Sequence, residues 1–300
     1  MRRDLNPDWI IPQWPAPAHV RAVCTTRAGG ASRVPFDAMN LGDHVGDDAR
    51  IVAQNRSLLR DEINATPVFL TQVHGVQVVA LDGAVASGTG LQADASMTRQ
   101  RGVACTIMVA DCLPVLFTNR QGTAVGAAHA GWRGLAGLAG DARQAESGVL
   151  EAFHQRFRAV AHAGITHVDT HSRANQALIE PTGEAPAAHD TLVWLGPCIG
   201  PEKFEVGDEV RDVFMASDEA DDVKASAKAM FKPLSAGKWL ADLAGLARLR
   251  LRAMGIENIS GNDGSPGWCT VSNPSRFFSH RRDAVTLGGS GRMAACIWLA

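Results

Sequence analysis

The sequence contains no tyrosine, no C-x-x-C pair of cysteines and no excess of basic side chains. Without tyrosine, no catalytic step of this protein can use a phenol hydroxyl. A formal net charge of -2 gives no basic surface for nucleic acid or for a membrane. No apolar run reaches about 18 residues, the length needed for a membrane-spanning helix. We therefore expect neither a nucleic-acid-binding nor a membrane protein.

The composition is typical of a folded chain. Hydrophobic residues make up 46% and charged residues 20%, which excludes a disordered chain. The 300 residues suffice for two ordinary domains or one large α/β domain. Residues 1–9 show no apolar signal segment. We therefore expect a cytoplasmic protein whose six cysteines are reduced thiols.

Short, valine-rich runs bounded by Gly, Asp, Asn or Pro predict strands buried under helices on both faces. They cover 20–26, 68–73, 77–81, 103–110, 115–118, 123–129, 193–199, 256–259 and 293–299. Helical periodicity covers 49–62, 135–157, 206–215 and 238–254. Residues 158–190 lack clear periodicity and are rich in Ala, His, Thr and Pro. We expect this segment to form a surface insertion.

Three strand ends carry side chains that can bind metal. His74 ends LTQVHG, Cys112 lies in VADCLP, and His129 lies in AAHAGWRG. Strand ends gather in space in α/β sheets, so these residues can converge. Two imidazoles and one thiolate suit Zn²⁺ with a fourth position open, as catalytic zinc requires. Their spacing matches no standard zinc motif, so ordinary strand-end or core positions remain an equal alternative.

The same side chains allow a second chemistry. Cys112 and His129 can act as a nucleophile and its base, with His74 as an orienting group. The sequence does not separate this interpretation from the zinc site. Cys24 and Cys105 lie in apolar runs, and we assign both to the core.

Polar residues near these motifs are candidates for substrate binding. Arg27 and Arg133 can hold a phosphate or carboxylate by bidentate hydrogen bonds. Asn40 and Gln72 lie in turn-rich segments near the same motifs. Asp94 and Asp111 are candidates for orienting the imidazoles. For each of these residues, a salt bridge or a turn cap is the alternative role.

Several motifs in order resemble the YfiH family, also named for laccase-domain polyphenol oxidases, peptidoglycan editing factors and purine nucleoside phosphorylases. They are TTRAGG (25–30), TQVHG (71–75), ADA (93–95), VADCLPVLF (109–117), AAHAGWRG (127–134), GPCIGP (196–201), FEVGDEV (204–210) and FFSHRRD (277–283) with GR (291–292). The resemblance implies one α/β domain over residues 1–300, a layered sandwich of mixed β-sheets flanked by helices. It also implies a zinc site of His74, Cys112 and His129.

The implied activity is phosphorolysis of adenosine, inosine, guanosine and 5′-methylthioadenosine, with deamination of adenosine. Purine nucleosides and phosphate are then the partners, and His74, Cys112 and His129 are catalytic. In this interpretation Arg27 and Arg133 hold phosphate, while Asn40 and Gln72 orient the nucleoside. Phe204, Phe278 and Phe36 stand where the family commonly has Tyr, as does His280.

Two alternatives remain. A Cys112–His129 amidohydrolase or peptidoglycan-precursor editing enzyme would survive metal chelation. A copper-dependent polyphenol oxidase is disfavoured because the sequence has no H-x-H pair, which multicopper sites use. Copper on a His₂Cys site would be adventitious, since Cu²⁺ binds most such ligands more tightly than Zn²⁺.

Overall fold

A computed structural model describes residues 5–83, 90–138, 147–162, 188–216 and 221–300. The larger of two central sheets has six strands. Their order is β12 (Asn258–Gly261), β8 (Thr191–Leu195), β6 (Leu113–Asn119), β7 (Val125–Ala130), β4 (Ala95–Thr98) and β3 (Val78–Ala80). The pairs β12–β8 and β3–β4 are parallel, and the other pairs are antiparallel. The sheet is therefore mixed.

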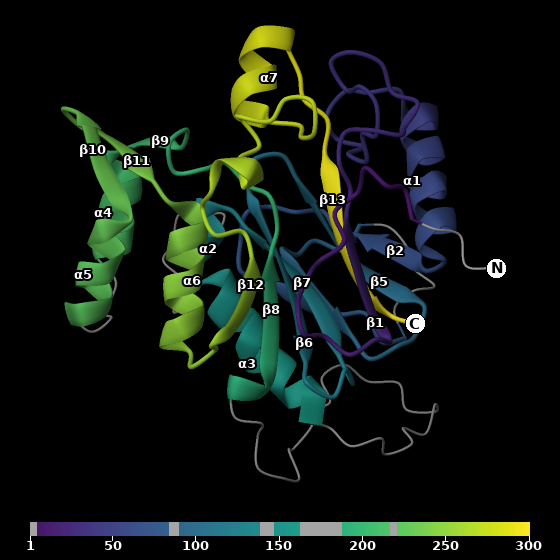
Figure 1. Cartoon of the computed structure of the whole chain (residues 1–300), viewed down its shortest axis with the longest axis horizontal. Helices are drawn as coiled ribbons and strands as arrows, with labels where there is room; N and C mark the ends of the chain where they lie inside the picture. The colour runs from purple at the N-terminus through teal and green to yellow at the C-terminus, as the bar shows by residue number, and fades with distance from the viewer. Residues whose placement is uncertain (1–4, 84–89, 139–146, 163–187, 217–220) are drawn as a thin grey trace.

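The second central sheet has four strands in the order β1 (Val20–Cys24), β13 (Met293–Leu299), β5 (Val103–Val109) and β2 (Thr66–Phe69). Only the β2–β5 pair is parallel. The C-terminal strand β13 lies between β1 and β5, so the two ends of the chain meet in one sheet (Figure 1). This pairing brings the segment that precedes β13 close to residues of the first half of the chain.

Alternating side chains divide the core into three layers, because successive residues of a strand face opposite sides of its sheet. In β6, Leu116 packs between the two sheets, whereas Phe117 packs on the outer face of the larger sheet. That outer face is covered by α3 (Val149–His162) and α6 (Leu243–Ala253). The helix α1 (Ala49–Ile63) covers the outer face of the smaller sheet (Figure 1). The predicted layered α/β sandwich with flanking helices is confirmed.

A small antiparallel sheet extends from one side of the sandwich. It consists of β10 (Phe231–Ser235), β11 (Lys238–Ala241) and β9 (Glu205–Gly207), next to α4 (Asp208–Met215) and α5 (Asp221–Ala229) (Figure 1). The remaining helices are α2 (Trp132–Leu135), α7 (His280–Leu287) and the short 3₁₀ turns Ala188–Asp190 and Pro266–Trp268. Among the described helices, none is long and apolar enough to cross a membrane.

Two predicted helices are wrong in extent. The predicted helix 238–254 is divided, because Lys238–Ala241 forms β11 and the Asp242 carboxylate caps α6 by accepting the N–H of Gly245 at 2.8 Å. The predicted helix 135–157 is divided as well: α2 ends at Leu135 and α3 begins at Val149. Residues 158–162 continue α3, and residues 163–187 of the predicted insertion at 158–190 lie outside the described residues.

Candidate metal centre

His74, Cys112 and His129 converge at one end of the two sheets. His74 lies in the turn after β2, Cys112 immediately precedes β6, and His129 lies near the end of β7. One ligand atom from each residue lies within 4.8 Å of the other two. Cys112 Sγ is 3.7 Å from His74 Nε2, and the two imidazole centroids are 4.7 Å apart. The sequence prediction that these three side chains come together is confirmed.

One buried carboxylate organises both histidines. Asp94 is fully buried, and its carboxylate accepts the backbone N–H groups of Val73, His74 and Gly75 at 3.2, 2.9 and 2.7 Å. The same carboxylate lies 2.8 Å from His129 Nδ1. His129 Nδ1 therefore carries the proton, which leaves Nε2 as the ring nitrogen able to bind a metal. The expected contact between Asp94 and an imidazole is confirmed, whereas the Asp111 carboxylate bonds to Thr270 and Arg281 instead of an imidazole.

The backbone around the three ligands is unusual. His74 has a φ of 61° and Asp111, next to Cys112, has a φ of 88°. Both values lie in the left-handed region, which side chains other than glycine seldom occupy. Three hydrogen bonds to Asp94 hold the His74 turn, whereas Asp111 is fixed by Thr270 Oγ1 at 2.5 Å and the N–H of Arg281 at 2.7 Å. The fold thus holds both ligand-bearing turns in conformations that they would seldom adopt alone.

Close packing explains why a glycine stands at position 131, two residues after His129. A Cβ on Gly131 would lie 3.0 Å from His74 Cδ2 and 3.1 Å from Cys112 Sγ. Because side chains in real structures seldom approach this closely, only glycine fits without moving a candidate ligand.

Charges in the cluster stabilise one another. Burial raises the pKa of the Cys112 thiol, but the neighbouring His129 and His74 more than offset this and lower it to about 6. Burial lowers the pKa of His129, and the Cys112 and Asp94 partners more than offset this and raise it. Without a metal, the pair therefore favours a thiolate facing an imidazolium, and the thiolate is the form that binds metals or attacks carbonyl carbon. Metal binding at His129 Nε2 requires loss of the second imidazole proton.

The three residues open into a cavity of about 390 Å³. This volume is within the range of sites for small organic ligands. The cavity is lined by hydrophobic side chains, by several cationic residues and by His74, Cys112 and His129. Its other polar or aromatic lining residues are His44, Gln72, Asp111, Trp132, Arg133, Phe204, His280, Arg281 and Arg292.

Two of the four predicted substrate-binding residues line this cavity. Arg133 is exposed there, and its guanidinium lies 4.4 Å from the centroid of the Trp132 ring. Gln72 also lines the cavity, but its amide pairs with the backbone of Met108, donating to the carbonyl and accepting the N–H, both at 2.8 Å. Gln72 therefore contributes to the wall while it joins the His74 turn to β5.

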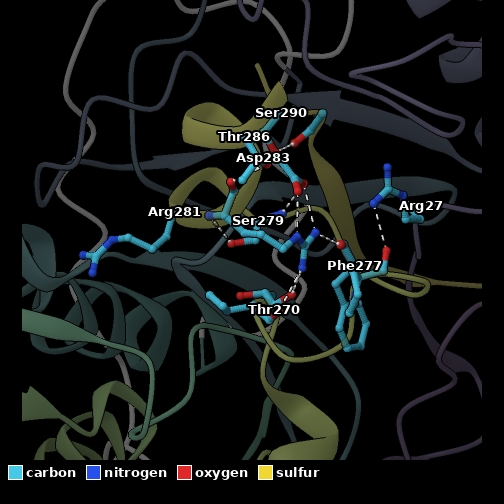
Figure 2. Close-up of polar contacts among 12 residues, drawn as sticks. Arg27, Thr270, Phe277, Ser279, Arg281, Asp283, Thr286 and Ser290 are labelled. Atoms are coloured by element: carbon cyan, nitrogen blue, oxygen red, sulfur yellow. Dashed lines mark hydrogen bonds and ion pairs between the residues drawn. The ribbon is translucent and has the colours of Figure 1, made fainter. Parts of the chain in front are cut away.

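The other two predicted residues do not line the cavity. Arg27 forms an ion pair with Asp37 at 3.0 Å and donates to the Pro274 carbonyl. Figure 2 shows Arg27 and Arg281 on opposite sides of the cluster formed by Ser279 and Asp283. Asn40 is fully buried, and its side chain bonds to Gly42, Asp47 and the N–H of Arg292. Asn40 therefore holds the backbone of Arg292, which lines the cavity, whereas Arg27 lies in a separate cleft with Asp37 and Pro274.

Sequence reasoning assigned no binding role to His44, His280, Arg281 or Arg292, which all line the cavity. Two of them, His280 and Arg281, lie in the motif FFSHRRD (277–283). A buried ion pair holds this motif, because Arg282 binds Asp283 at 2.6 Å and also donates to the carbonyl groups of Thr270 and Phe277 (Figure 2). Arg292 belongs to the GR pair (291–292) of the family motifs, but the sequence alone assigns it no place in the site.

The donor set fits a metal of borderline softness. One thiolate sulfur and two imidazole nitrogens are ligands that Zn²⁺ prefers, and three protein ligands leave a coordination position for a small molecule. The buried Asp94 supplies the carboxylate that usually supports a metal-binding imidazole. Among the described residues, this is the one group of three or more His, Cys, Asp or Glu side chains with suitable geometry. Within that part of the chain, the ligands suffice for a single ion.

Comparison with known proteins places the chain in a family. The protein-family model described as multi-copper polyphenol oxidoreductase laccase matches residues 21–148 and 149–300. A purine nucleoside phosphorylase of Pseudomonas aeruginosa is 44% identical, and the alignment covers 97% of this chain and 98% of that protein. The purine nucleoside phosphorylase YfiH of Escherichia coli is 42% identical, with the same coverage of both chains.

Solved structures agree with these matches. A Neisseria meningitidis protein superposes with a TM-score of 0.77 at 37% identity, covering 97% of this chain and 99% of that chain. YlmD from Geobacillus stearothermophilus gives a TM-score of 0.72 at 30% identity, covering 94% and 92%. The chain therefore belongs to the YfiH family, whose model carries the description multi-copper polyphenol oxidoreductase laccase, as its motifs predicted.

Proposed function

We propose that this protein is a zinc-dependent purine nucleoside phosphorylase that acts on adenosine, inosine, guanosine and 5′-methylthioadenosine, and that it also deaminates adenosine. The observation that carries the proposal is the convergence of His74, Cys112 and His129 within 4.8 Å at a cavity of about 390 Å³. Close relatives named purine nucleoside phosphorylase support the same activity.

His74, Cys112 and His129 would hold the zinc ion, and Asp94 would keep His129 in the orientation that exposes Nε2. When bound, zinc supplies a positive charge that polarises an oxygen ligand and stabilises developing negative charge. Copper is not required in this proposal, because the described residues offer one three-ligand group rather than several.

Phosphorolysis exchanges one bond at the ribose. An oxygen of inorganic phosphate forms a bond to C1′, and the bond from C1′ to the purine nitrogen breaks with its electron pair on the purine. The purine then takes up a proton, for which His280 on the cavity wall is the candidate donor. Arg133 would help to neutralise the phosphate, and Trp132 offers an aromatic face against which a base can stack.

Deamination of adenosine uses water as the nucleophile. The oxygen of water forms a bond to C6 of the purine and the bond from C6 to the amino nitrogen breaks. One proton of the water leaves with the amino group as ammonia, and the other ends on N1 of the product. Both reactions place a purine nucleoside in the same cavity.

Phosphate-dependent cleavage of inosine tests the proposal. The expected products are hypoxanthine and ribose 1-phosphate in equal amounts, with no cleavage when phosphate is withheld. Release of free ribose at the same rate without phosphate would identify a hydrolase and contradict the phosphorylase assignment.

A second candidate function uses the same thiol. Cys112 Sγ lies within 4.8 Å of a ring nitrogen of His129, with His74 beside both, and a Cys112–His129 pair can open an amide bond by forming a thioester. Such an amidohydrolase or peptidoglycan-precursor editing enzyme would keep its activity after chelation and lose it on alkylation of Cys112. The phosphorylase would lose activity on chelation and recover it when zinc is restored.

A further inference from the structure

Arg292 is a positive charge at the cavity that lacks a carboxylate partner. It is half-buried, immediately precedes β13 and lines the cavity. Its Nη1 group donates to the carbonyl oxygens of Ser290 and Gly291 at 2.9 and 3.1 Å. Within the part of the chain that the structure describes, these carbonyl groups are its side-chain hydrogen-bond partners, and no carboxylate forms an ion pair with it.

Among the residues that line the cavity, Asp111 and Cys112 are the two whose side chains can carry a negative charge. The Asp111 carboxylate already accepts Thr270 Oγ1 and the N–H of Arg281. The Cys112 sulfur belongs to the candidate metal centre. Because a partly desolvated cation is unfavourable unless an anion compensates it, Arg292 is prepared to receive an anion from outside the protein.

Several contacts fix Arg292 in place. The buried Asn40 side chain accepts the N–H of Arg292 at 2.9 Å, and the N–H of Leu41 donates to the Arg292 carbonyl at 3.1 Å. Gly42 packs on the arginine stem so closely that a Cβ there would lie 2.8 Å from Arg292 Cγ. Loop 40–42 thus holds the arginine at both its backbone and its stem, which lowers the entropic cost of binding a ligand.

The surroundings of Arg292 are cationic as well. His44 lines the same cavity, and burial together with the charge of Arg292 lowers the pKa of this imidazole, so His44 itself adds no positive charge. Arg133 and Arg281 also line the cavity and form no ion pair with a carboxylate among the described residues. Three arginines around one cavity in a chain of net charge -2 attract a compact oxyanion.

We propose that Arg292 is the anchor of an oxyanion subsite beside the metal centre and that inorganic phosphate is the anion it binds. The choice of phosphate rests on the proposed phosphorolysis. The oxyanion subsite itself rests on the burial, fixation and missing carboxylate partner of Arg292.

Direct binding of inorganic phosphate tests the subsite without any nucleoside. Phosphate is expected to raise the melting temperature of the zinc-loaded wild-type protein in a concentration-dependent way. The variants Arg292→Lys, which keeps the charge, and Arg292→Gln, which removes it, are expected to lose most of this shift. Arg27→Gln is the matched control, since Arg27 is paired with Asp37 in a separate cleft and its loss should leave the shift intact.

Steady-state kinetics then separates phosphate binding from general damage. Arg292→Lys should raise the KM for phosphate by about tenfold to a hundredfold, the value of one charge-assisted arginine contact. The KM for inosine should change much less than the KM for phosphate, because the proposed contact of Arg292 is with phosphate and not with the nucleoside. Equal increases in both KM values would contradict the assignment.

The outcomes distinguish this proposal from the proposed function. If inosine is cleaved but the Arg292 variants retain the phosphate shift and the phosphate KM, the Arg292 assignment is wrong and the phosphorylase stands. If wild-type protein cleaves no nucleoside but phosphate still stabilises it through Arg292, the phosphorylase is wrong and the oxyanion subsite stands.

Discussion

At the scale of single residues, Asp94 connects two of the three candidate ligands through one buried carboxylate. It accepts three consecutive backbone N–H groups of the His74 turn and the Nδ1–H of His129. An asparagine at this position would present an NH₂ group toward some of these donors and would remove the charge. We therefore predict that Asp94→Asn weakens zinc binding by about 10–100-fold, measured by competition with a chelator.

Asp82 provides a matched control for that variant. Its carboxylate also anchors a loop, accepting Thr98 Oγ1 at 2.6 Å and the N–H of Arg99 at 2.9 Å, but it does not line the cavity. Asp82→Asn should lower stability without changing the affinity for zinc. If both variants change zinc affinity equally, the effect of Asp94 is a general loss of structure and its orienting role is wrong.

His154 makes stability depend on pH at a site far from the chemistry. Burial, reinforced by the charge of Arg158, lowers the pKa of this imidazole from its ordinary 6.5 to about 4. Between these two pH values the unfolded chain binds a proton that the folded protein does not, so stability falls as the pH drops from about 6.5 to 4. The loss attributable to His154 is about 3 kcal/mol.

The variant His154→Gln should remove that part of the pH dependence. Glutamine can still accept the hydrogen bond from Thr191 Oγ1, which lies 3.3 Å from His154 Nε2, but it does not titrate. Urea unfolding at pH 7, 5.5 and 4.5 measures the difference between variant and wild type. Identical acid sensitivity of the two proteins would contradict the assignment.

At the scale of secondary-structure elements, α2 supports the His74 turn by close backbone contact. A Cβ on Gly134 would lie 2.8 Å from the carbonyl oxygen of Gly75. Gly134→Ala should therefore separate α2 from the turn, cost about 1–3 kcal/mol in unfolding free energy and weaken zinc binding.

Gly267→Ala is the control for Gly134→Ala. No atom lies within 4 Å of a Cβ placed on Gly267. The free energy of unfolding of the Gly267→Ala protein should therefore differ from that of the wild type by about 0.5 kcal/mol or less. Thermal unfolding and chelator competition measure both effects. A Gly134→Ala protein as stable and as zinc-competent as the Gly267→Ala protein would show that this contact is unimportant.

A comparison of predicted and observed elements shows which parts of the fold can be predicted from the sequence. The buried runs around β5, β6, β7 and β13 are predicted well, because continuous apolar residues suit strands covered on both faces. The helix predicted over 238–254 is too long because leucines in β11 and α6 continue one helical pattern. Asp242, a typical N-cap residue at the boundary, is the signal that separates the strand from the helix.

At the scale of the whole molecule, the site forms where two sheets and the C-terminal segment meet. His74, Cys112 and His129 are predictable because each follows or ends an apolar strand beside Gly or Pro. Arg292 is not predictable in this way, because it reaches the cavity only when β13 inserts between β1 and β5. Arg27 carries the same side chain near a glycine turn, yet it pairs with Asp37 outside the cavity.

The most direct test of the account measures bound metal and phosphorolysis on the same preparation. Protein purified without added metal is analysed for zinc and copper by mass spectrometry, and hypoxanthine release from inosine is followed with phosphate present. We predict about one zinc per chain, the ligand count of a single three-residue site, with both zinc and release lost in Cys112→Ala and His74→Ala. Metal-free protein with full activity, or Cys112→Ala with full zinc and full release, would contradict the central claim.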